Sequence, residues 1–235
     1  HLHDDLMISK KTGPTDLVTQ MDQQVQKDLV EKITHRYPED RIFAEEDGLR
    51  SPISEGSVWV IDPIDGTNNF VTQKEDFAVM VAYFEDGIGQ FGLIYDVMRD
   101  YLFYGGGEFP VYRNEVELTL FVDQPLENFL IASNVGMLEK NDWGMADLGM
   151  DSLGIRVYGS AGISFSKILS GGILAYFSYI WPWDYAAAAI MGEQLGYTVL
   201  NLNGDKPNYQ SVEPIMMVPK VKLTEIQTYL KKGRS

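Results

Sequence analysis

Short apolar runs separated by turn residues dominate the first half of the chain. The run of four apolar residues at 58–61 predicts a buried strand that stops at Asp62, because the rigid Pro63 follows. A shorter run at 42–44 predicts another strand. Three longer runs are separated by turns that contain Gly and Asp, at residues 77–84, 88–97 and 101–104. This spacing is typical of an antiparallel meander.

A helix is predicted before these strands. Val25, Leu29 and Ile33 recur every four residues, which indicates one apolar helical face. The helix should begin at Asp22 and end near Arg36, because a proline two residues further on cannot continue it.

From about residue 129 the pattern changes to strands that alternate with helices. Apolar runs predict strands at residues 129–133, 155–158, 173–180, 197–202 and 215–218. Helices are predicted at residues 159–169, 185–191 and 223–230, with glycines after the first two. We therefore divide the chain into an N-terminal α+β half, residues 1–128, and a C-terminal α/β half, residues 129–235. We expect the halves to pack as one structural unit of the α+β class.

The composition restricts the possible chemistry of the protein more than it restricts the possible fold. The chain has 235 residues, 45% of them apolar, and no apolar stretch approaches the roughly 18 residues of a membrane span. With no signal peptide recognised, we expect a cytoplasmic protein without a membrane partner. Cysteine is absent and His35 is the single histidine away from the N-terminus, which excludes thiol catalysis and cysteine-ligated zinc. Catalysis must therefore use carboxylates, carbonyls and hydroxyls, which bind hard cations such as Mg2+.

The charge balance argues against a polyanionic partner. The chain carries 34 acidic and 19 basic residues, a formal charge of −15. Such a surface disfavours nucleic acid. A small anionic substrate would need a bound metal ion to draw it in.

Several acidic residues stand where predicted strands end or helices begin. Glu45 follows the first short strand, Asp62 and Asp65 follow the next, and Asp184 precedes a helix. Each has a plainer interpretation, because Glu45 can lie in a solvated turn, Asp65 in an Asp-Gly turn, and Asp22 and Asp184 can be helix N-caps. If the strands are neighbours in one sheet, however, the carboxylates meet at one edge. Such crowding is costly without cations.

These carboxylates and one exposed carbonyl can form a cage for two or three Mg2+ ions. Two such ions can hold a phosphate group and stabilise both the attacking and the leaving oxygen. The pattern therefore indicates a phosphatase in which water attacks phosphorus and its proton passes toward Thr67 and Asp22. The backbone N–H groups of Gly66 and Thr67 would point at the phosphate if a helix begins there.

Four segments carry a family resemblance. Residues 62–70, Asp-Pro-Ile-Asp-Gly-Thr-Asn-Asn-Phe, resemble the signature of the inositol monophosphatase family, a branch of the lithium-sensitive, magnesium-dependent phosphatases that includes fructose-1,6-bisphosphatases. Residues 183–188 resemble its second signature, and residues 16–19 with Asp22 and residues 44–46 match two further elements in the expected order. The resemblance implies a layered α-β-α-β-α sandwich with a large antiparallel sheet and a second, mixed sheet in the C-terminal half. It also implies a homodimer inhibited by lithium.

The same resemblance assigns roles to the acidic residues. It implies that Glu45, Asp62 and the carbonyl of Ile64 bind a first metal ion. Asp62, Asp65 and Asp184 would bind a second, so that Asp62 bridges the two. Glu45 would also help, through waters, to hold a weaker third ion. The expected catalytic residues are therefore Thr67, Asp22 and Glu45.

The chain departs from the family pattern at two positions. Ala44 replaces the usual glycine, which is a mild change. Phe177-Ser178 stands where inositol-selective relatives carry a glutamate that contacts substrate hydroxyls, and its absence weakens the case for inositol. Residues 160–162, Ser-Ala-Gly, still match the segment that lines the sugar pocket in the family, although they would also begin a helix. The expected substrate-binding residues are Gly66, Thr67, Ser160, Ala161, Gly162, Ser178 and Asp184.

We therefore expect a phosphoric monoester hydrolase that uses Mg2+ to cleave a small polyol or sugar phosphate of the inositol 1-phosphate type. NADP(H), fructose 1,6-bisphosphate and 3′-phosphoadenosine 5′-phosphate stay open as substrates. An alternative of another class is a non-catalytic protein that binds phosphate ligands through metal ions. Thr67 and Asp22 argue against it, because binding alone needs no activated water.

Overall fold

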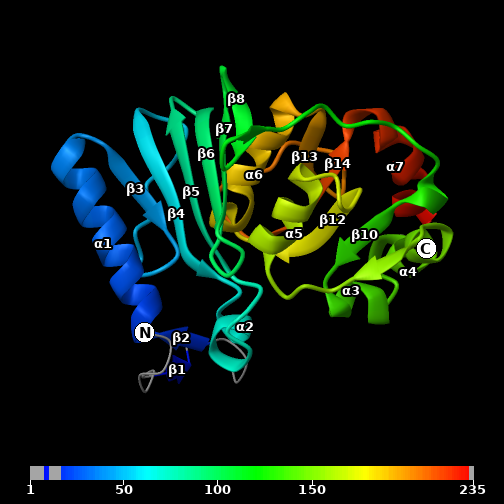
Figure 1. The fold of residues 1–235 in the computed structure, drawn as a ribbon, viewed down its shortest axis with the longest axis horizontal. Helices are drawn as coiled ribbons and strands as arrows, with labels where there is room; N and C mark the ends of the chain where they lie inside the picture. Colours follow the sequence, from blue (N-terminus) through cyan, green and yellow to red (C-terminus); the bar gives the residue numbers. More distant parts are fainter. Residues whose placement is uncertain (1–7, 11–16, 233–235) are drawn as a thin grey trace.

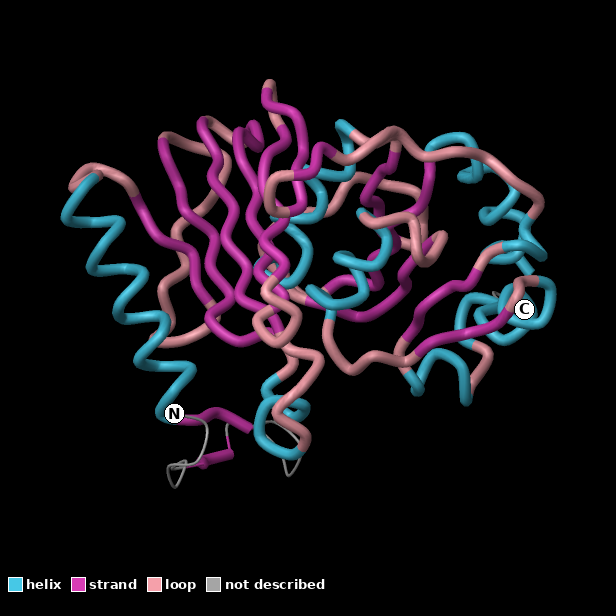
Figure 2. Tube along the Cα trace, in the orientation of Figure 1, coloured by secondary structure: helices cyan, strands magenta, loops and turns pink. Residues whose placement is uncertain are grey.

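The molecule consists of five layers in which helices and sheets alternate (Figures 1 and 2). The computed structural model describes residues 8–10 and 17–232. Helix α1 (Gln20–Arg36) covers one face of a seven-stranded sheet, and α5 (Ala161–Leu169) and α6 (Pro182–Gln194) lie between this sheet and a five-stranded one. The last layer contains α3 (Val135–Glu139), α4 (Met145–Asp151) and α7 (Leu223–Lys232). This arrangement is the expected α-β-α-β-α sandwich.

The seven-stranded sheet contains the predicted meander. Its strand order is β3-β4-β5-β6-β7-β8-β9. β3 and β4 are parallel, and every other neighbouring pair is antiparallel. The strands are β3 (Arg41–Ala44), β4 (Ser57–Asp65), β5 (Ala78–Glu85), β6 (Ile88–Asp96), β7 (Tyr101–Gly106), β8 (Phe109–Arg113) and β9 (Val116–Glu117).

The predicted end of β4 at Asp62 is wrong. The strand continues to Asp65, and its register against β5 shifts between these two residues. Pro63 lies inside the shift and has no N–H to donate to a neighbouring strand, so an irregularity at this point lets the pairing resume beyond it. Both carboxylates are therefore carried by a strand, not by a loop.

The five-stranded sheet is mixed, as expected. Its order is β11-β10-β12-β14-β13. β10 is parallel to β11 and to β12, whereas β14 is antiparallel to β12 and to β13. Its strands all follow residue 128 and those of the large sheet all precede it, although the division into two halves there stays a prediction. The strands are β10 (Leu130–Ser133), β11 (Gly154–Arg156), β12 (Ala175–Ile180), β13 (Tyr197–Asn201) and β14 (Glu213–Pro219).

The elements that the apolar pattern did not predict are short. Among them, α3 is capped by the Asn134 side chain, which accepts a hydrogen bond from the Met137 N–H. Asp16, in one of the matched segments, lies outside the described residues. The short elements include β8, β9, α3 and α4, the pair β1 (Ile8–Lys10) and β2 (Leu17–Thr19), α2 (Thr67–Thr72), and 3-10 helices at Leu126–Asn128, Asp142–Gly144 and Lys220–Lys222.

The main core fills the layer between the two sheets. Met80 of the large sheet, Ala187 of α6 and Met217 of the smaller sheet belong to one buried cluster. Gly92 allows α6 to approach the large sheet, because a Cβ at this position would lie 2.4 Å from the Ala187 carbonyl oxygen. Within residues 17–232, no helix is long and apolar enough to cross a membrane. The cytoplasmic location stays a prediction.

Candidate active site

The acidic residues at the ends of β3 and β4 lie side by side. The two strands are parallel with Ala44 opposite Ile61, and the Glu45 N–H donates a hydrogen bond of 3.1 Å to the Ile61 carbonyl. Glu45 therefore leaves the sheet beside Asp62, the next residue of β4. Parallel pairing thus brings together two acids that are well separated in the sequence.

Asp62, Asp65 and Asp184 form a carboxylate cluster. One oxygen from each side chain lies within 4.8 Å of the others. The first two come from the end of β4, and the third comes from the first turn of α6. The prediction that Asp184 is an N-cap is wrong, because Trp181 is the N-cap and Asp184 Oδ2 accepts a 2.7 Å hydrogen bond from the Trp181 N–H. Pro182 begins the helix, where its missing N–H costs nothing.

The cluster is electrostatically unfavourable on its own. Burial raises the pKa of Asp62 well above its usual range, and the negative charges of Glu45, Asp65 and Asp184 add to the rise. Burial also raises the pKa of Asp184, followed by the charges of Asp65 and Glu45. Asp62 is 1% exposed, and its Oδ1 has no hydrogen-bond partner among the described residues. A buried carboxylate oxygen without a partner, among other acids, fits a hard cation such as Mg2+.

Asp65 is held by the start of α5. Its carboxylate accepts hydrogen bonds from the Ser160 hydroxyl, from the Ala161 N–H at 3.0 Å and from the Gly162 N–H at 2.8 Å. Burial raises the Asp65 pKa, and these three donors oppose the rise. Ser160 is also the N-cap of α5, since its hydroxyl accepts the Ile163 N–H at 3.1 Å. The expected sugar-pocket segment therefore lies at the site with these three donors directed at Asp65.

The Thr67 hydroxyl links α1 to the end of β4. This hydroxyl lies 3.1 Å from Asp22 Oδ1 and 3.1 Å from the Ile64 carbonyl oxygen. Asp22 is buried in the first turn of α1, and the prediction that it begins this helix is wrong, because α1 starts at Gln20. Gly66, with φ of 86°, turns the chain between β4 and α2.

Phe177 and Ser178 are neighbours on β12, the strand that precedes the second signature, and their side chains point to opposite faces of the sheet. Phe177 is completely buried in a second apolar cluster, here called the outer core, which lies between the smaller sheet and helices α4 and α7. Ser178 is buried on β12 and accepts a hydrogen bond of 3.2 Å from the Asn134 side chain. Since neighbouring residues of a strand point to opposite faces, only Ser178 of this pair points away from the outer core.

Sequence reasoning assigned no role to two asparagines, Asn69 and Asn134. Asn69 Nδ2 donates to the Asp76 carbonyl at 2.9 Å and to the Tyr158 carbonyl at 2.7 Å, which ties α2 to the segment that leads into α5. Asn134 follows β10, the parallel neighbour of β12. A polar residue directly after a strand was the same signal that identified Glu45, and it could have identified Asn134.

The layered fold and the buried carboxylate cluster at the strand ends define a class, the metal-dependent phosphoric monoester hydrolases. The model of the inositol monophosphatase family matches residues 1–233. The chain belongs to this family, and it is a phosphoric monoester hydrolase.

Individual relatives agree with this assignment. The inositol-1-monophosphatase of Bacillus subtilis (strain 168) is 36% identical over 210 residues, which cover 87% of this chain and 79% of the relative. An IMPase/NADP phosphatase complexed with Mg2+ and phosphate has a TM-score of 0.88 at 26% identity and covers 96% of this chain and 86% of its own. A lithium chloride-soaked inhibitory complex of Staphylococcal inositol monophosphatase-1 has a TM-score of 0.87 at 27% identity, with coverage of 96% and 84%.

Proposed function

We propose that this chain is a Mg2+-dependent phosphatase that hydrolyses a small polyol or sugar phosphate of the inositol 1-phosphate type. The observation that carries the proposal is a buried oxygen of Asp62 that has no hydrogen-bond partner in the described part of the chain and lies inside a cluster of acids. The structural neighbour that holds Mg2+ and phosphate supports the choice of metal. The name of the Bacillus subtilis relative supports the substrate class.

The carboxylates at the strand ends are the proposed metal ligands. Glu45, Asp62 and the Ile64 carbonyl would hold one ion, and Asp62, Asp65 and Asp184 a second. Glu45 would also help, through waters, to hold a weaker third. When bound, Mg2+ would neutralise the carboxylates, bind phosphate oxygens and lower the pKa of a water molecule. The hydrogen bonds from Ser160 to Gly162 would fix the orientation of Asp65 before any ion arrives.

Thr67 and Asp22 are proposed to move the proton. The Thr67 hydroxyl can accept a proton from the attacking water while it gives its own to Asp22 Oδ1, which lies 3.1 Å away. The Thr67 hydroxyl also lies 3.1 Å from the Ile64 carbonyl oxygen, which is itself a proposed metal ligand. A protein that only binds phosphate compounds needs no such relay, so the Thr67–Asp22 contact favours catalysis.

Recognition of the alcohol part of the substrate is proposed to involve Ser178, Asp184 and the start of α5, with Gly66 and Thr67 facing the phosphate. Ser178 and Asn134 offer a hydroxyl and an amide where inositol-selective relatives are expected to carry a carboxylate. This neutral pair keeps NADP, fructose 1,6-bisphosphate and 3′-phosphoadenosine 5′-phosphate as candidate substrates. The structural neighbour described as an IMPase/NADP phosphatase supports the first of these.

A substrate panel tests the proposal. Phosphate release would be measured with Mg2+ from inositol 1-phosphate, fructose 1,6-bisphosphate, NADP and 3′-phosphoadenosine 5′-phosphate, with and without lithium. We expect turnover of inositol 1-phosphate that requires Mg2+ and falls when lithium is added. Absence of turnover on the whole panel would reject the proposed function, whereas turnover of another member alone would change the substrate and keep the chemistry.

We also propose that the chain forms a homodimer through its outer layer. Met150, Leu153 and Val157, on and around α4 and β11, are 84%, 63% and 53% exposed. Large apolar side chains exposed on neighbouring elements favour contact with another surface. Sedimentation equilibrium should give twice the chain mass, and the double variant Met150→Asp, Leu153→Asp should give the monomer mass. A monomeric unchanged protein would reject the dimer.

A further inference from the structure

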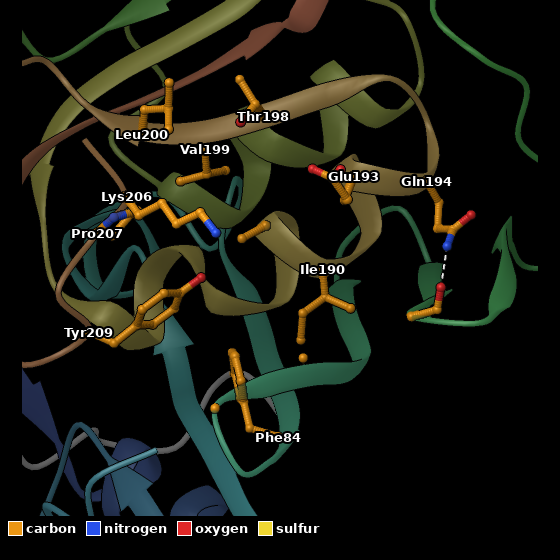
Figure 3. A pocket seen from close by; sticks show the side chains of 14 residues that line it. Phe84, Ile190, Glu193, Gln194, Thr198, Val199, Leu200, Lys206, Pro207 and Tyr209 are labelled. Carbon is orange, nitrogen blue, oxygen red and sulfur yellow. Dashed lines mark hydrogen bonds between the residues drawn. The ribbon is translucent and has the colours of Figure 1, made fainter. Parts of the chain in front are cut away.

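A cavity of about 370 Å3 lies against the C-terminal half of α6 (Figure 3). Its lining includes Ala189 and Ile190 of α6, Val199 of β13, and Lys206 and Tyr209 of the loop that joins β13 to β14. Ala189 is five residues beyond Asp184, so the cavity begins about 7.5 Å along the helix axis from that end of the carboxylate cluster. None of the proposed catalytic, metal-binding or substrate-binding residues lines it.

The walls of this cavity are held in place by contacts of their own. The Tyr209 ring packs against Phe84 at 5.5 Å and against Tyr185 at 5.2 Å between ring centroids. The Gln194 side chain donates a hydrogen bond to the Gly107 carbonyl, which joins the end of α6 to the turn between β7 and β8. A site built this way is largely formed before a ligand binds, which lowers the cost of binding.

The lining of the cavity includes the positive charge of Lys206, which has no ion-pair partner in the part of the chain that the structure describes. The Lys206 side chain extends into it, and the Tyr209 hydroxyl points into the same space (Figure 3). No described carboxylate lies within ion-pair distance of Lys206, and Glu193, which also lines the cavity, is paired with Lys220. The chain as a whole has a formal charge of −15. An ammonium group and a hydroxyl that converge in this cavity therefore select for an anionic group.

Part of the remaining lining is apolar. Phe84, Ile190 and Val199 offer flat or branched carbon surfaces beside the polar pair. The volume is at the lower end of the roughly 300–1,000 Å3 that small-molecule sites span, which limits the ligand to a compact molecule of at most about three rings.

We propose that this cavity is a binding site for a small aromatic anion. The anionic group would bind to Lys206 Nζ and the Tyr209 hydroxyl, and the ring would lie against Ile190 and Val199. This site is separate from the carboxylate cluster and does not depend on the proposed phosphatase activity.

The probe for this site is 8-anilinonaphthalene-1-sulfonate, an aromatic anion whose fluorescence increases in apolar surroundings. It would be titrated into the full chain in the presence of Mg2+ and saturating inorganic phosphate, so that the carboxylate cluster and its metal ions are already occupied. We expect saturable binding of one probe per chain. Lys206→Ala should raise the dissociation constant at least about tenfold, because a charge-assisted hydrogen bond is lost. Lys206→Arg should restore most of the affinity.

Two further variants separate this site from general adhesion. Lys140→Ala removes one exposed positive charge at the end of α3 and should leave the dissociation constant unchanged within about twofold. Ala189→Trp should fill the cavity and abolish saturable binding. The proposal is overturned if no saturable binding occurs, or if Lys206→Ala weakens the probe no more than Lys140→Ala does. A folded Ala189→Trp variant that binds the probe normally would also overturn it.

Discussion

Asp62→Asn removes one negative charge from the carboxylate cluster and keeps the size of the side chain. In the proposed site Asp62 contacts both main metal ions, so the substitution disturbs both at once. We expect kcat to fall at least about 10²-fold, which corresponds to about 2.7 kcal/mol of activation free energy. The fold should survive, because the affected oxygen has no hydrogen-bond partner among the described residues.

The same substitution should not destabilise the metal-free protein. Two full negative charges at the 4.8 Å limit of the cluster repel each other by about 3.5 kcal/mol at an effective dielectric constant of ~20. The raised pKa of Asp62 allows a proton to relieve part of this repulsion. We therefore expect Asp62→Asn to unfold in EDTA at the same temperature as the unchanged protein or a higher one.

Two assays on the same preparations separate these effects. Phosphate release with Mg2+ gives kcat, and thermal unfolding in EDTA and in Mg2+ gives the stability of each state. Mg2+ should raise the unfolding temperature of the unchanged protein more than that of Asp62→Asn. Asp96→Asn is a matched control, because Asp96 is also 1% exposed but is paired with Arg99 at 3.0 Å. It should lower the unfolding temperature and leave kcat within a few-fold.

Either of two results would refute this reasoning. A kcat for Asp62→Asn close to that of the unchanged protein would reject its bridging role. A clear loss of stability in EDTA would reject the conclusion that the cluster is unfavourable without cations.

Further variants and conditions test other parts of the site. Thr67→Val removes the hydroxyl that contacts Asp22 and should lower kcat by about 10²-fold or more in phosphate-release assays, whereas Thr67→Ser should stay active; equal activities would exclude the relay. Gly162→Ala places a Cβ 2.8 Å from another side chain and should cost about 1–3 kcal/mol in denaturant unfolding, so an unchanged midpoint would contradict this packing. Asn69→Leu leaves two backbone carbonyls without their donor and should lower stability by about 1–3 kcal/mol, well beyond the effect of Asn68→Leu at the exposed neighbouring position. In EDTA, the raised carboxyl pKa values mean that the folded state keeps protons that the unfolded chain releases near pH ~4. The contribution of these carboxyl groups to stability should therefore be fully present below that pH and be lost as the pH rises through their folded pKa values, and a flat contribution would contradict the shifts.

The apolar pattern predicted most of the long elements but not how the chain leaves them. The meander, the alternation after residue 129 and the helices at 159–169 and 223–230 follow from periodicity, which is a local property. The continuation of β4 to Asp65 could not be predicted in this way, because it depends on pairing with β5 on the far side of Pro63. Tertiary pairing overcame the local tendency of proline to end a strand.

The two N-cap interpretations failed for a similar reason. Asp22 and Asp184 both lie inside the first turn of their helices, each as the third residue of its helix. For Asp184 the difference arises because Trp181, a residue without a favourable capping side chain, takes the N-cap position. The sequence motif named both acids as candidates, whereas the backbone determines which way each carboxylate points.

The hydrogen bonds between Asp65 and the start of α5 have a consequence for the order of folding. Asp65 ends a strand of the large sheet, whereas α5 and α6 belong to the later half of the chain and pack between the two sheets. Neither half of the chain alone therefore contains all three residues of the carboxylate cluster. Phosphatase activity should return during refolding only after the strands and helices have formed and docked, so its recovery should lag behind the far-ultraviolet circular dichroism signal. Such a lag would make activity a direct probe of docking.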